Sequence, residues 1–365
     1  MKSPDMSLLP VRNHAPRVLY LPNEGDFREG HGQVGGRVAF AEMERTGLIG
    51  ELRVYSFLAD YYAKAKNREA SYRALLEQVR AFQPEILFWQ HPIGYPIRRD
   101  LLREIRSCGS SPLIAYHEGD PFDCYYKRMP REVVTLYKDC DVFLTIGLGD
   151  ARRLFSKLRV HPHFYYSSHT FDLERFGEPP VKEAIASKYD AVMIGTIASW
   201  KWGIHRQRYA GQRIRLGRAL AKLLGSRFAA FGNGWPANAN GQGPIPYNEQ
   251  VKTIQTSRMS VIWDLYPDYT FYYSDRLPIA LASGIPFVTN NRNGLDILLK
   301  ECPGVYLANS IEDILDIVIY LRSLDLDEIA SIGAAGRAWA IANIEARMVF
   351  RKAFETCLRI WRSRR

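Results

Sequence analysis

Short apolar runs alternate with segments of helical periodicity along most of the chain. Between the runs, apolar positions recur every three to four residues, for example across residues 72–82, which is the period of an amphipathic helix. Strands that alternate with helices form parallel sheets, so the first half of the sequence predicts a parallel α/β domain. The apolar runs of the first half predict strands at residues 18–21, 52–57, 86–89, 113–116, 142–146 and 164–166.

The same alternation continues after a polar segment at residues 177–188, which contains Pro179 and Pro180 and is typical of a linker. Two doubly wound domains of similar size follow from this pattern, with a ligand cleft at the carboxyl ends of their strands. The predicted domains span residues 1–178 and 179–342, followed by a basic amphipathic helix at 343–365. Further strands are predicted at 191–194, 228–231, 260–264, 287–289 and 305–307, and helices starting near Arg206, Tyr247, Asp275, Gly294 and Ile311.

The composition is that of a globular protein, with 47% apolar and 24% charged residues. A net charge of +10, from 49 Lys and Arg against 39 Asp and Glu, favours partners that carry phosphate. Most basic residues are spread along the chain, whereas a nucleic-acid-binding protein usually gathers them in one stripe. The cluster between Arg359 and Arg365 predicts a docked helix with a solvated basic face; the alternative is contact with an anionic membrane surface.

The five cysteines have no CxxC spacing, so the sequence indicates neither a zinc site nor a disulfide framework. A reducing cytoplasm suits such a chain best. Residues 1–16 lack the apolar run of a signal peptide, and no window is long and apolar enough to span a bilayer. We therefore expect a cytoplasmic protein that is at most peripheral on the inner membrane face, with no cofactor.

The most informative segment is residues 272–289, which predicts a loop, a helix stopped by Gly284, and a buried strand. The helix would begin at Ser274 or Asp275. A helix N-terminus presents free N–H groups and the positive end of a dipole, so it can hold a phosphate or a ribose hydroxyl. The alternative is that these two side chains only cap the helix.

A second candidate segment, residues 195–208, follows the first strand of the second domain. A glycine at the strand end lets the backbone approach a ligand, and cationic side chains can neutralise a diphosphate leaving group. The alternative is a solvated basic start of a helix. The candidates are Gly195, Thr196, Lys201, Arg206 and Arg208.

A third candidate segment, residues 115–122, follows the fourth predicted strand. His117 is the side chain best suited to proton transfer near neutral pH, although a lone histidine is more often structural. Glu118 and Asp120 are close enough in sequence to share that task. The alternative for Asp120, which precedes Pro121, is that it only shapes the turn.

A glycine-rich loop at residues 30–36 follows the first strand. It lacks the spacing of the dinucleotide-binding fingerprint and the acidic residue downstream, which makes a Rossmann dehydrogenase unlikely. Gly35 and Gly36 would still allow a close approach of the backbone to a ligand.

The segment 272–289 resembles the donor site of group-1 glycosyltransferases with the GT-B architecture. It is closest to the CgeB-like branch, where a Ser-Asp-Arg-Leu start precedes an Ala-Leu-Ala-x-Gly helix and a Pro-x-Val-Thr strand. Residues 169–176 are similar to the segment that closes the N-terminal domain of that family. Residues 231–235 and 244–247 look like its Gly-x-Gly-Trp segment and the proline-led turn that follows.

This resemblance implies two Rossmann-like domains facing a cleft, with the last helix crossing back to the first domain. It implies transfer of a sugar from a nucleotide-sugar bound in the C-terminal half to an acceptor hydroxyl held by the N-terminal half, without a metal and with retention of configuration. His117 looks like the histidine that such enzymes place facing the reacting sugar, and Gly35 and Gly36 would lie near the acceptor and donor phosphates. The implied donor-binding set adds Gly232, Ser274, Asp275 and Arg276 to the residues of segment 195–208.

The chain departs from the wider family at two positions. Phe271 and Ile279 stand where many members carry glutamates eight residues apart, so the usual carboxylate anchor for the donor ribose is missing. Asp275 and Arg276 are then our candidates for nucleotide contact. A nucleotide-sugar epimerase of the same architecture is one alternative, and a non-catalytic binding protein for sugar nucleotides or nucleic acid is another.

Overall fold

The computed structural model describes residues 14–25, 34–123, 127–176, 179–197, 199–200, 205–206 and 209–364. Its first half forms a six-stranded parallel sheet in the order β2-β1-β3-β4-β5-β6. The order reverses between β1 and β3, which is the kind of switch point where doubly wound sheets bind ligands. The strands are β1 (Arg17–Leu21), β2 (Glu51–Val54), β3 (Ile86–Gln90), β4 (Leu113–Glu118), β5 (Val142–Thr145) and β6 (His163–Tyr166).

The central strands β1, β3, β4 and β5 of this first sheet are buried on both faces, which explains why they read as mainly apolar runs, whereas the edge strands β2 and β6 are partly exposed. Val18 and Tyr20 pack on one face, against the helices at Val34–Arg45 and Ala346–Ser363. Leu19 and Leu21 pack on the other face. The helices are α1 (Val34–Arg45), α2 (Phe57–Ala63), α3 (Arg68–Phe82), α4 (Arg99–Ser107), α5 (Arg131–Asp139), α6 (Asp150–Ser156) and α7 (Leu173–Phe176).

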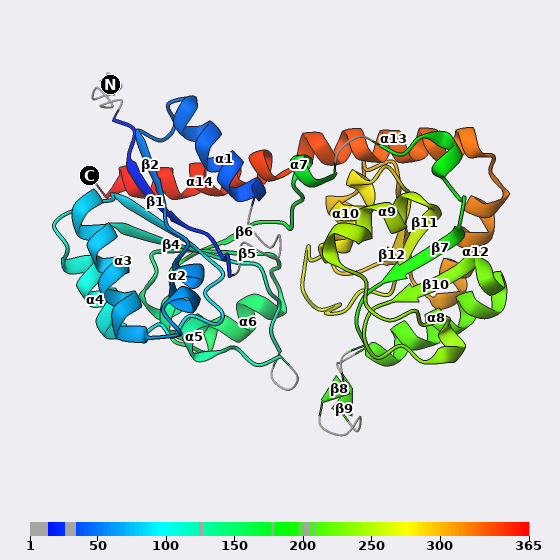
Figure 1. Ribbon diagram of the computed structural model, residues 1–365, viewed down its shortest axis with the longest axis horizontal. Helices are drawn as coiled ribbons and strands as arrows, with labels where there is room; N and C mark the ends of the chain where they lie inside the picture. Colours follow the sequence, from blue (N-terminus) through cyan, green and yellow to red (C-terminus); the bar gives the residue numbers. More distant parts are fainter. Residues whose placement is uncertain are drawn as a thin grey trace, which may run out of the picture.

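The second half forms a five-stranded parallel sheet in the order β10-β7-β11-β12-β13 (Figure 1). Its strands are β7 (Tyr189–Ile194), β10 (Phe228–Phe231), β11 (Ser257–Ile262), β12 (Phe287–Asn290) and β13 (Val305–Ala308). Outside this sheet, β8 (Ser199–Trp200) pairs antiparallel with β9 (His205–Arg206). The helices are α8 (Ala210–Leu224), α9 (Gln250–Gln255), α10 (Arg276–Ala282), α11 (Leu295–Leu298), α12 (Ile311–Ser323), α13 (Leu326–Asn343) and α14 (Ala346–Ser363).

The predicted alternation of strands and helices is confirmed, although several element ends shift, and three of these shifts are informative. The strand expected at 52–57 stops at Val54 because Phe57 starts α2 and buries its ring against Trp89 and Tyr95. The strand expected at 260–264 begins earlier and ends at Ile262, which leaves Asp264 beyond the strand. The helix expected near Arg206 begins at Ala210.

Helix α14 crosses back to the first domain, as the sequence predicted (Figure 1). Phe350 and Phe354 lie 6.0 and 5.9 Å from Phe40 of α1, measured between ring centroids. No helix of the described residues combines the length and the apolar character that a bilayer crossing needs. The predicted boundary at residue 178 touches residues 177–178, which lie outside the described part, and it stays a prediction.

The loop between β11 and α10 holds the second domain against the first. The hydroxyl of Tyr269 donates to the carbonyl of Phe122 at 2.6 Å, and that of Tyr273 donates to the carbonyl of His169 at 3.0 Å. Buried tyrosines with paired hydroxyls contribute both apolar contact and direction. These two hydrogen bonds therefore fix how far apart the strand ends of the two domains lie.

Candidate active site

A cavity of about 570 Å3 lies between the two domains, at the carboxyl ends of both sheets. This is where doubly wound folds bind ligands. Six of the predicted site residues line it: Gly36, His117, Asp120, Thr196, Asp275 and Arg276. The cavity is also lined by His91, Lys127, Asp172, Arg213 and Asp264.

Two arginines meet beside Gly195, directly after β7. A Cβ atom at Gly195 would lie 3.2 Å from Nη1 of Arg213 and 3.2 Å from Nε of Arg276, so a side chain there would crowd both guanidinium groups. Arg276 donates to the carbonyl of Ile194 at 2.8 Å, and Arg213 donates to that of Thr196 at 3.0 Å. The backbone thus fixes two like charges at the wall of the cavity.

The predicted glycines Gly195 and Gly232 pack against each other. Gly232 has φ +132°, and a Cβ atom on it would lie 2.4 Å from the carbonyl oxygen of Gly195. The indole Nε1 of Trp235 donates to the same oxygen at 2.6 Å. These contacts hold the turn after β7 in place, so Gly232 supports the shape of the site through its packing against Gly195.

Asp264 balances part of the positive charge and is 2% exposed. It accepts hydrogen bonds from Arg292 Nη2 at 2.9 Å and from the backbone N–H of Ser274 at 2.9 Å, while Arg213 Nη2 lies 3.9 Å away. Burial alone raises the pKa of Asp264, but the charges of Arg292, Arg276 and Arg213 together lower it below its ordinary value. The carboxylate therefore stays ionised.

Arg213 is buried, and its pKa falls to about 10 because of burial and the charge of Arg276 nearby. The sequence analysis missed this residue. A signal was present, because Arg213 interrupts the apolar stripe of α8 that includes Ala210, Gly217 and Leu220. A charge on the buried face of a helix usually has a specific partner or a function.

The other predicted donor residues have different positions. Asp275 is the residue before α10, but its side chain makes no capping bond; it accepts a hydrogen bond from Arg276 Nη1 at 3.0 Å. Ser274 is buried, and its Oγ has no hydrogen-bond partner among the described residues. Lys201 and Arg208 lie outside the described residues, as does the side chain of Arg206.

On the first-domain side, His117 occupies β4 and lines the cavity while being 6% exposed. Its Nε2 lies 3.1 Å from Oγ of Ser167, and its Nδ1 has no partner among the described residues. Burial, together with the neighbouring His169 and His91, lowers the pKa of His117 to about 3. The ring is therefore neutral at physiological pH, which suits a hydrogen bond to a ligand better than proton donation.

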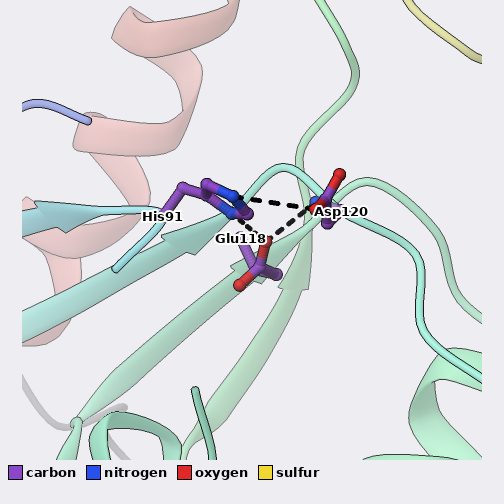
Figure 2. A group of neighbouring side chains, drawn as sticks. All are labelled: His91, Glu118 and Asp120. Carbon is purple, nitrogen blue, oxygen red and sulfur yellow. Dashed lines mark hydrogen bonds and ion pairs between the residues drawn. The ribbon is translucent and has the colours of Figure 1, made fainter. Parts of the chain in front are cut away.

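A second histidine, His91, was missed by the sequence analysis. It follows β3, and Figure 2 shows it facing Glu118 and Asp120 at the ends of the strands. The same rule that selected His117, a polar side chain at the end of a buried strand, would have found it. Glu118 is fully buried and bonds to Nδ1 of His91, and Nε2 of His91 lies 3.7 Å from Oδ2 of Asp120.

The same three residues are also the described group whose side chains could hold a metal ion, since their ligand atoms all lie within 4.8 Å of one another. Asp120 has a competing partner, because Nζ of Lys127 lies 2.7 Å from its Oδ2. Besides the turn-shaping role considered for it, Asp120 therefore also forms an ion pair with Lys127.

The glycine loop falls largely outside the described residues, which resume at Val34. Gly36 lines the cavity, and a Cβ atom there would lie 2.2 Å from the hydroxyl oxygen of Tyr20. Gly35 donates its backbone N–H to Oδ1 of Asp172 at 2.9 Å. Both glycines therefore make room for neighbouring protein groups, and the predicted close approach of a ligand stays a prediction.

Residues 206–352 match the family model described as glycosyl transferase-like. This match identifies a glycosyltransferase-like domain in the C-terminal half and agrees with the predicted enzyme class. The sequence matches no curated protein at a significant level. The resemblance to the CgeB-like branch stays a prediction.

Solved structures of glycosyltransferases share the architecture of the whole chain, which confirms the predicted GT-B fold. An alpha-glucosyltransferase in complex with UDP superposes with a TM-score of 0.62 and 13% identity, covering 94% of this chain and 99% of that one. Anabaena HepE in complex with UDP and glucose gives 0.54 and 12%, covering 93% and 98%. Sucrose-phosphate synthase from Thermosynechococcus elongatus gives 0.56 and 11%, covering 95% and 100%.

Proposed function

We propose that this protein transfers a sugar from a nucleotide-sugar donor to an acceptor hydroxyl. The glycosyltransferase-like match in the C-terminal half and the GT-B fold support the reaction class. The observation that carries the proposal is the pair Arg213 and Arg276, fixed beside Gly195 at the cavity wall. Arg213 is buried and Arg276 is partly exposed. Two guanidinium groups close to each other gain stability from an anion placed between them.

The anion that this position suits best is the diphosphate of the donor. Negative charge develops on the diphosphate as the sugar leaves, and preorganised cations stabilise that charge most effectively in a site that excludes water. Arg213 is held by two carbonyl oxygens, of Trp263 and Thr196, at 3.0 Å each. Because these side chains supply positive charge themselves, we propose transfer without a metal, and the family resemblance adds retention of configuration.

UDP is the first nucleotide to test, because two of the similar structures hold UDP. We place its diphosphate at Arg213, Arg276 and Thr196, with Asp275 within reach of the ribose, since the family glutamates are replaced by Phe271 and Ile279. Ile279 is buried in α10 and offers no polar group. Lys201, Arg206 and Arg208 stay predicted members of the same donor site.

The acceptor would be held by the first domain, facing His117 and Asp120. Since the ring of His117 is neutral and its Nδ1 has no partner among the residues that the structure describes, we propose that it holds a hydroxyl of the donor sugar. The class of acceptor, a cytoplasmic location and contact of α14 with an anionic membrane surface stay predictions.

Calorimetric titration with UDP tests the donor site directly. Arg276→Ala should weaken UDP binding by about 1.5–3 kcal/mol, because a charge-assisted contact is lost. Arg322→Ala is the matched control: Arg322 lies 3.1 Å from Asp190 in the same domain and does not line the cavity. Equal UDP affinity in the two variants would remove Arg276 from the site. A thermal-shift comparison of UDP-, GDP-, ADP- and TDP-glucose then identifies the base.

A further inference from the structure

The backbone at His91 is held in an uncommon conformation beside the cavity. His91 has φ +36°, a region that non-glycine residues rarely occupy, and its backbone N–H donates to the carbonyl oxygen of His117 at 2.8 Å. Such conformations cost energy and persist where the surroundings impose them, often at functional sites. Here the result is that the imidazole of His91 turns toward the end of β4 (Figure 2).

Glu118 determines which nitrogen of His91 faces the cavity. Its fully buried carboxylate accepts hydrogen bonds from the hydroxyl of Tyr116, from Nδ1 of His91, and from the backbone N–H of Asp120 at 2.8 Å. A carboxylate only accepts, so Nδ1 must carry a proton. In the neutral ring Nε2 is then the unprotonated nitrogen, and it lies on the side of Asp120, 3.7 Å from Oδ2.

The charged groups around His91 favour its protonated form. Burial by itself lowers the pKa of His91, but the charge and hydrogen bond of Glu118, together with the charge of Asp120, outweigh burial and raise it. Lys127 acts in the opposite direction and reduces the shift. His117, in the neighbouring strand β4, is neutral and differs from His91 because its pKa is lowered by burial and by two histidines, with no contribution from a carboxylate of the described residues.

We propose that His91 accepts the proton of the acceptor hydroxyl during transfer, with Glu118 as its positioning residue. The acceptor O–H bond breaks, its proton moves to Nε2, and the acceptor oxygen bonds to the anomeric carbon. The bond from that carbon to the diphosphate oxygen breaks, and its electron pair leaves with the nucleotide. The proposal rests on the proposed glycosyltransferase function, and it holds for either stereochemical outcome because the acceptor oxygen loses its proton in both.

A metal ion held by His91, Glu118 and Asp120 is the competing role for these residues. Three donors already bind the carboxylate of Glu118. The ammonium group of Lys127 lies 2.7 Å from the carboxylate of Asp120. A cation would have to displace these donors. Proton transfer uses the groups as they stand.

The first test is spectroscopic and does not depend on turnover. The full-length chain, labelled with 15N in its eight histidines, is titrated by NMR. We expect His91 to appear as the Nδ1–H tautomer with a pKa above the ordinary value of about 6.5, and Glu118→Gln to lower that pKa. An Nε2–H tautomer, or a pKa that Glu118→Gln leaves unchanged, overturns the proposal. Saturation of the His91 signal by micromolar Zn²⁺ or Mn²⁺ assigns the cluster to a metal instead.

The second test measures UDP release from UDP-glucose, with water or added sugars as acceptor. His91→Asn suits the left-handed backbone and should lower kcat by roughly 10²–10⁴-fold while UDP affinity stays unchanged. In the wild type the rate should rise with pH through the pKa of His91, because only the neutral ring accepts a proton, and Glu118→Gln should move that rise to lower pH. The control His163→Gln changes an exposed histidine of β6.

The outcomes of the two tests separate the two proposals. Near-normal release by His91→Asn overturns the role of His91 and leaves the glycosyltransferase function standing. A wild type that binds none of UDP-, GDP-, ADP- and TDP-glucose and turns over none of them refutes the proposed function, whatever the NMR titration shows. A wild type that binds UDP but turns over no donor leaves the NMR titration to decide on His91.

Discussion

The two walls of the cavity use charge in different ways. On the second-domain wall, Arg213, Arg276 and Arg292 surround the buried carboxylate of Asp264, and arginines stay charged throughout the physiological range. On the first-domain wall, a carboxylate and an imidazole are paired, and an imidazole changes its charge near neutral pH. Fixed charge suits binding of an anion, whereas a titratable pair suits the movement of a proton.

The difference also appears between two histidines of the first-domain wall. His117 lies in β4 and His91 directly follows the neighbouring β3, and the backbones of the two residues are hydrogen-bonded. Of these two rings, His91 is the one that contacts a carboxylate among the described residues, and the pKa values of the two rings move in opposite directions. A histidine at a strand end therefore says little about proton transfer until its neighbours are known.

The largest effect should follow from removing the carboxylate of the second-domain wall. Asp264→Asn leaves buried guanidinium groups without their counter-charge, which typically costs about 3–5 kcal/mol of unfolding free energy. Asp190→Asn is the control, because the partners of Asp190, Arg227 and Arg322, are 39% and 51% exposed at their side chains. Urea unfolding should show the larger loss for Asp264→Asn. An equal loss in both variants would mean that the arginine cluster is not held by Asp264.

The next effect concerns nucleotide binding by the two walls. Arg213→Met keeps the length of the side chain but removes its charge, and should weaken UDP binding by about 1.5–3 kcal/mol. Asp120→Asn, on the opposite wall, should change UDP affinity about twofold or less, since this carboxylate pairs with Lys127. Calorimetry measures both. If Asp120→Asn weakened UDP more than Arg213→Met, the nucleotide would lie on the other wall.

A smaller effect should be visible in the pH dependence of stability. The folded state holds His117 unprotonated down to about pH 3, whereas the unfolded chain binds the proton near pH 6.5. The unfolded state therefore binds more protons between these values, so stability falls as the pH is lowered. The contribution approaches about 1.4 kcal/mol per pH unit.

His117→Gln removes that contribution, so its unfolding free energy should fall less steeply than that of the wild type between pH 6 and pH 4. Urea unfolding at several pH values gives the two slopes. His163→Gln, at an exposed position, serves as the control. Parallel slopes for His117→Gln and the wild type would show that His117 is not held neutral by burial.

Much of the fold could be predicted because both sheets are buried between helices and their strands are continuous apolar runs. The errors lie at element ends, where tertiary contacts decide. Phe57 reads as the end of a strand but starts a helix, because its ring packs against Trp89 and Tyr95. The sequence of residues 52–57 alone does not show that the ring of Phe57 packs against these two side chains.

The site could be predicted only in part, and for a physical reason. Arg276 and His117 sit next to strand or helix ends, which sequence patterns locate, and both line the cavity. Arg213 and Asp264 come into the site through the packing of α8 and the loop after β11. The apolar stripe of α8 marks Arg213 as unusual but does not show which site it enters, and no local pattern indicates Asp264. The role of His91 depends on Glu118, which is 27 residues away in the chain.

The smallest effect should come from the end of the chain, which belongs to neither wall. Truncation after Trp361 removes Arg364, whose Nη2 lies 2.9 Å from Asp141. Asp141 keeps a second partner, because Arg106 lies 3.0 Å away, and exposed ion pairs contribute about 1 kcal/mol or less. Trp361 itself is buried against the first domain, so truncation before Leu358, which also removes Ile360, should destabilise the protein far more. UDP affinity and UDP release should stay at wild-type level after truncation behind Trp361. If either were lost, the basic tail would be part of the site, and the contrast between the two walls would be incomplete.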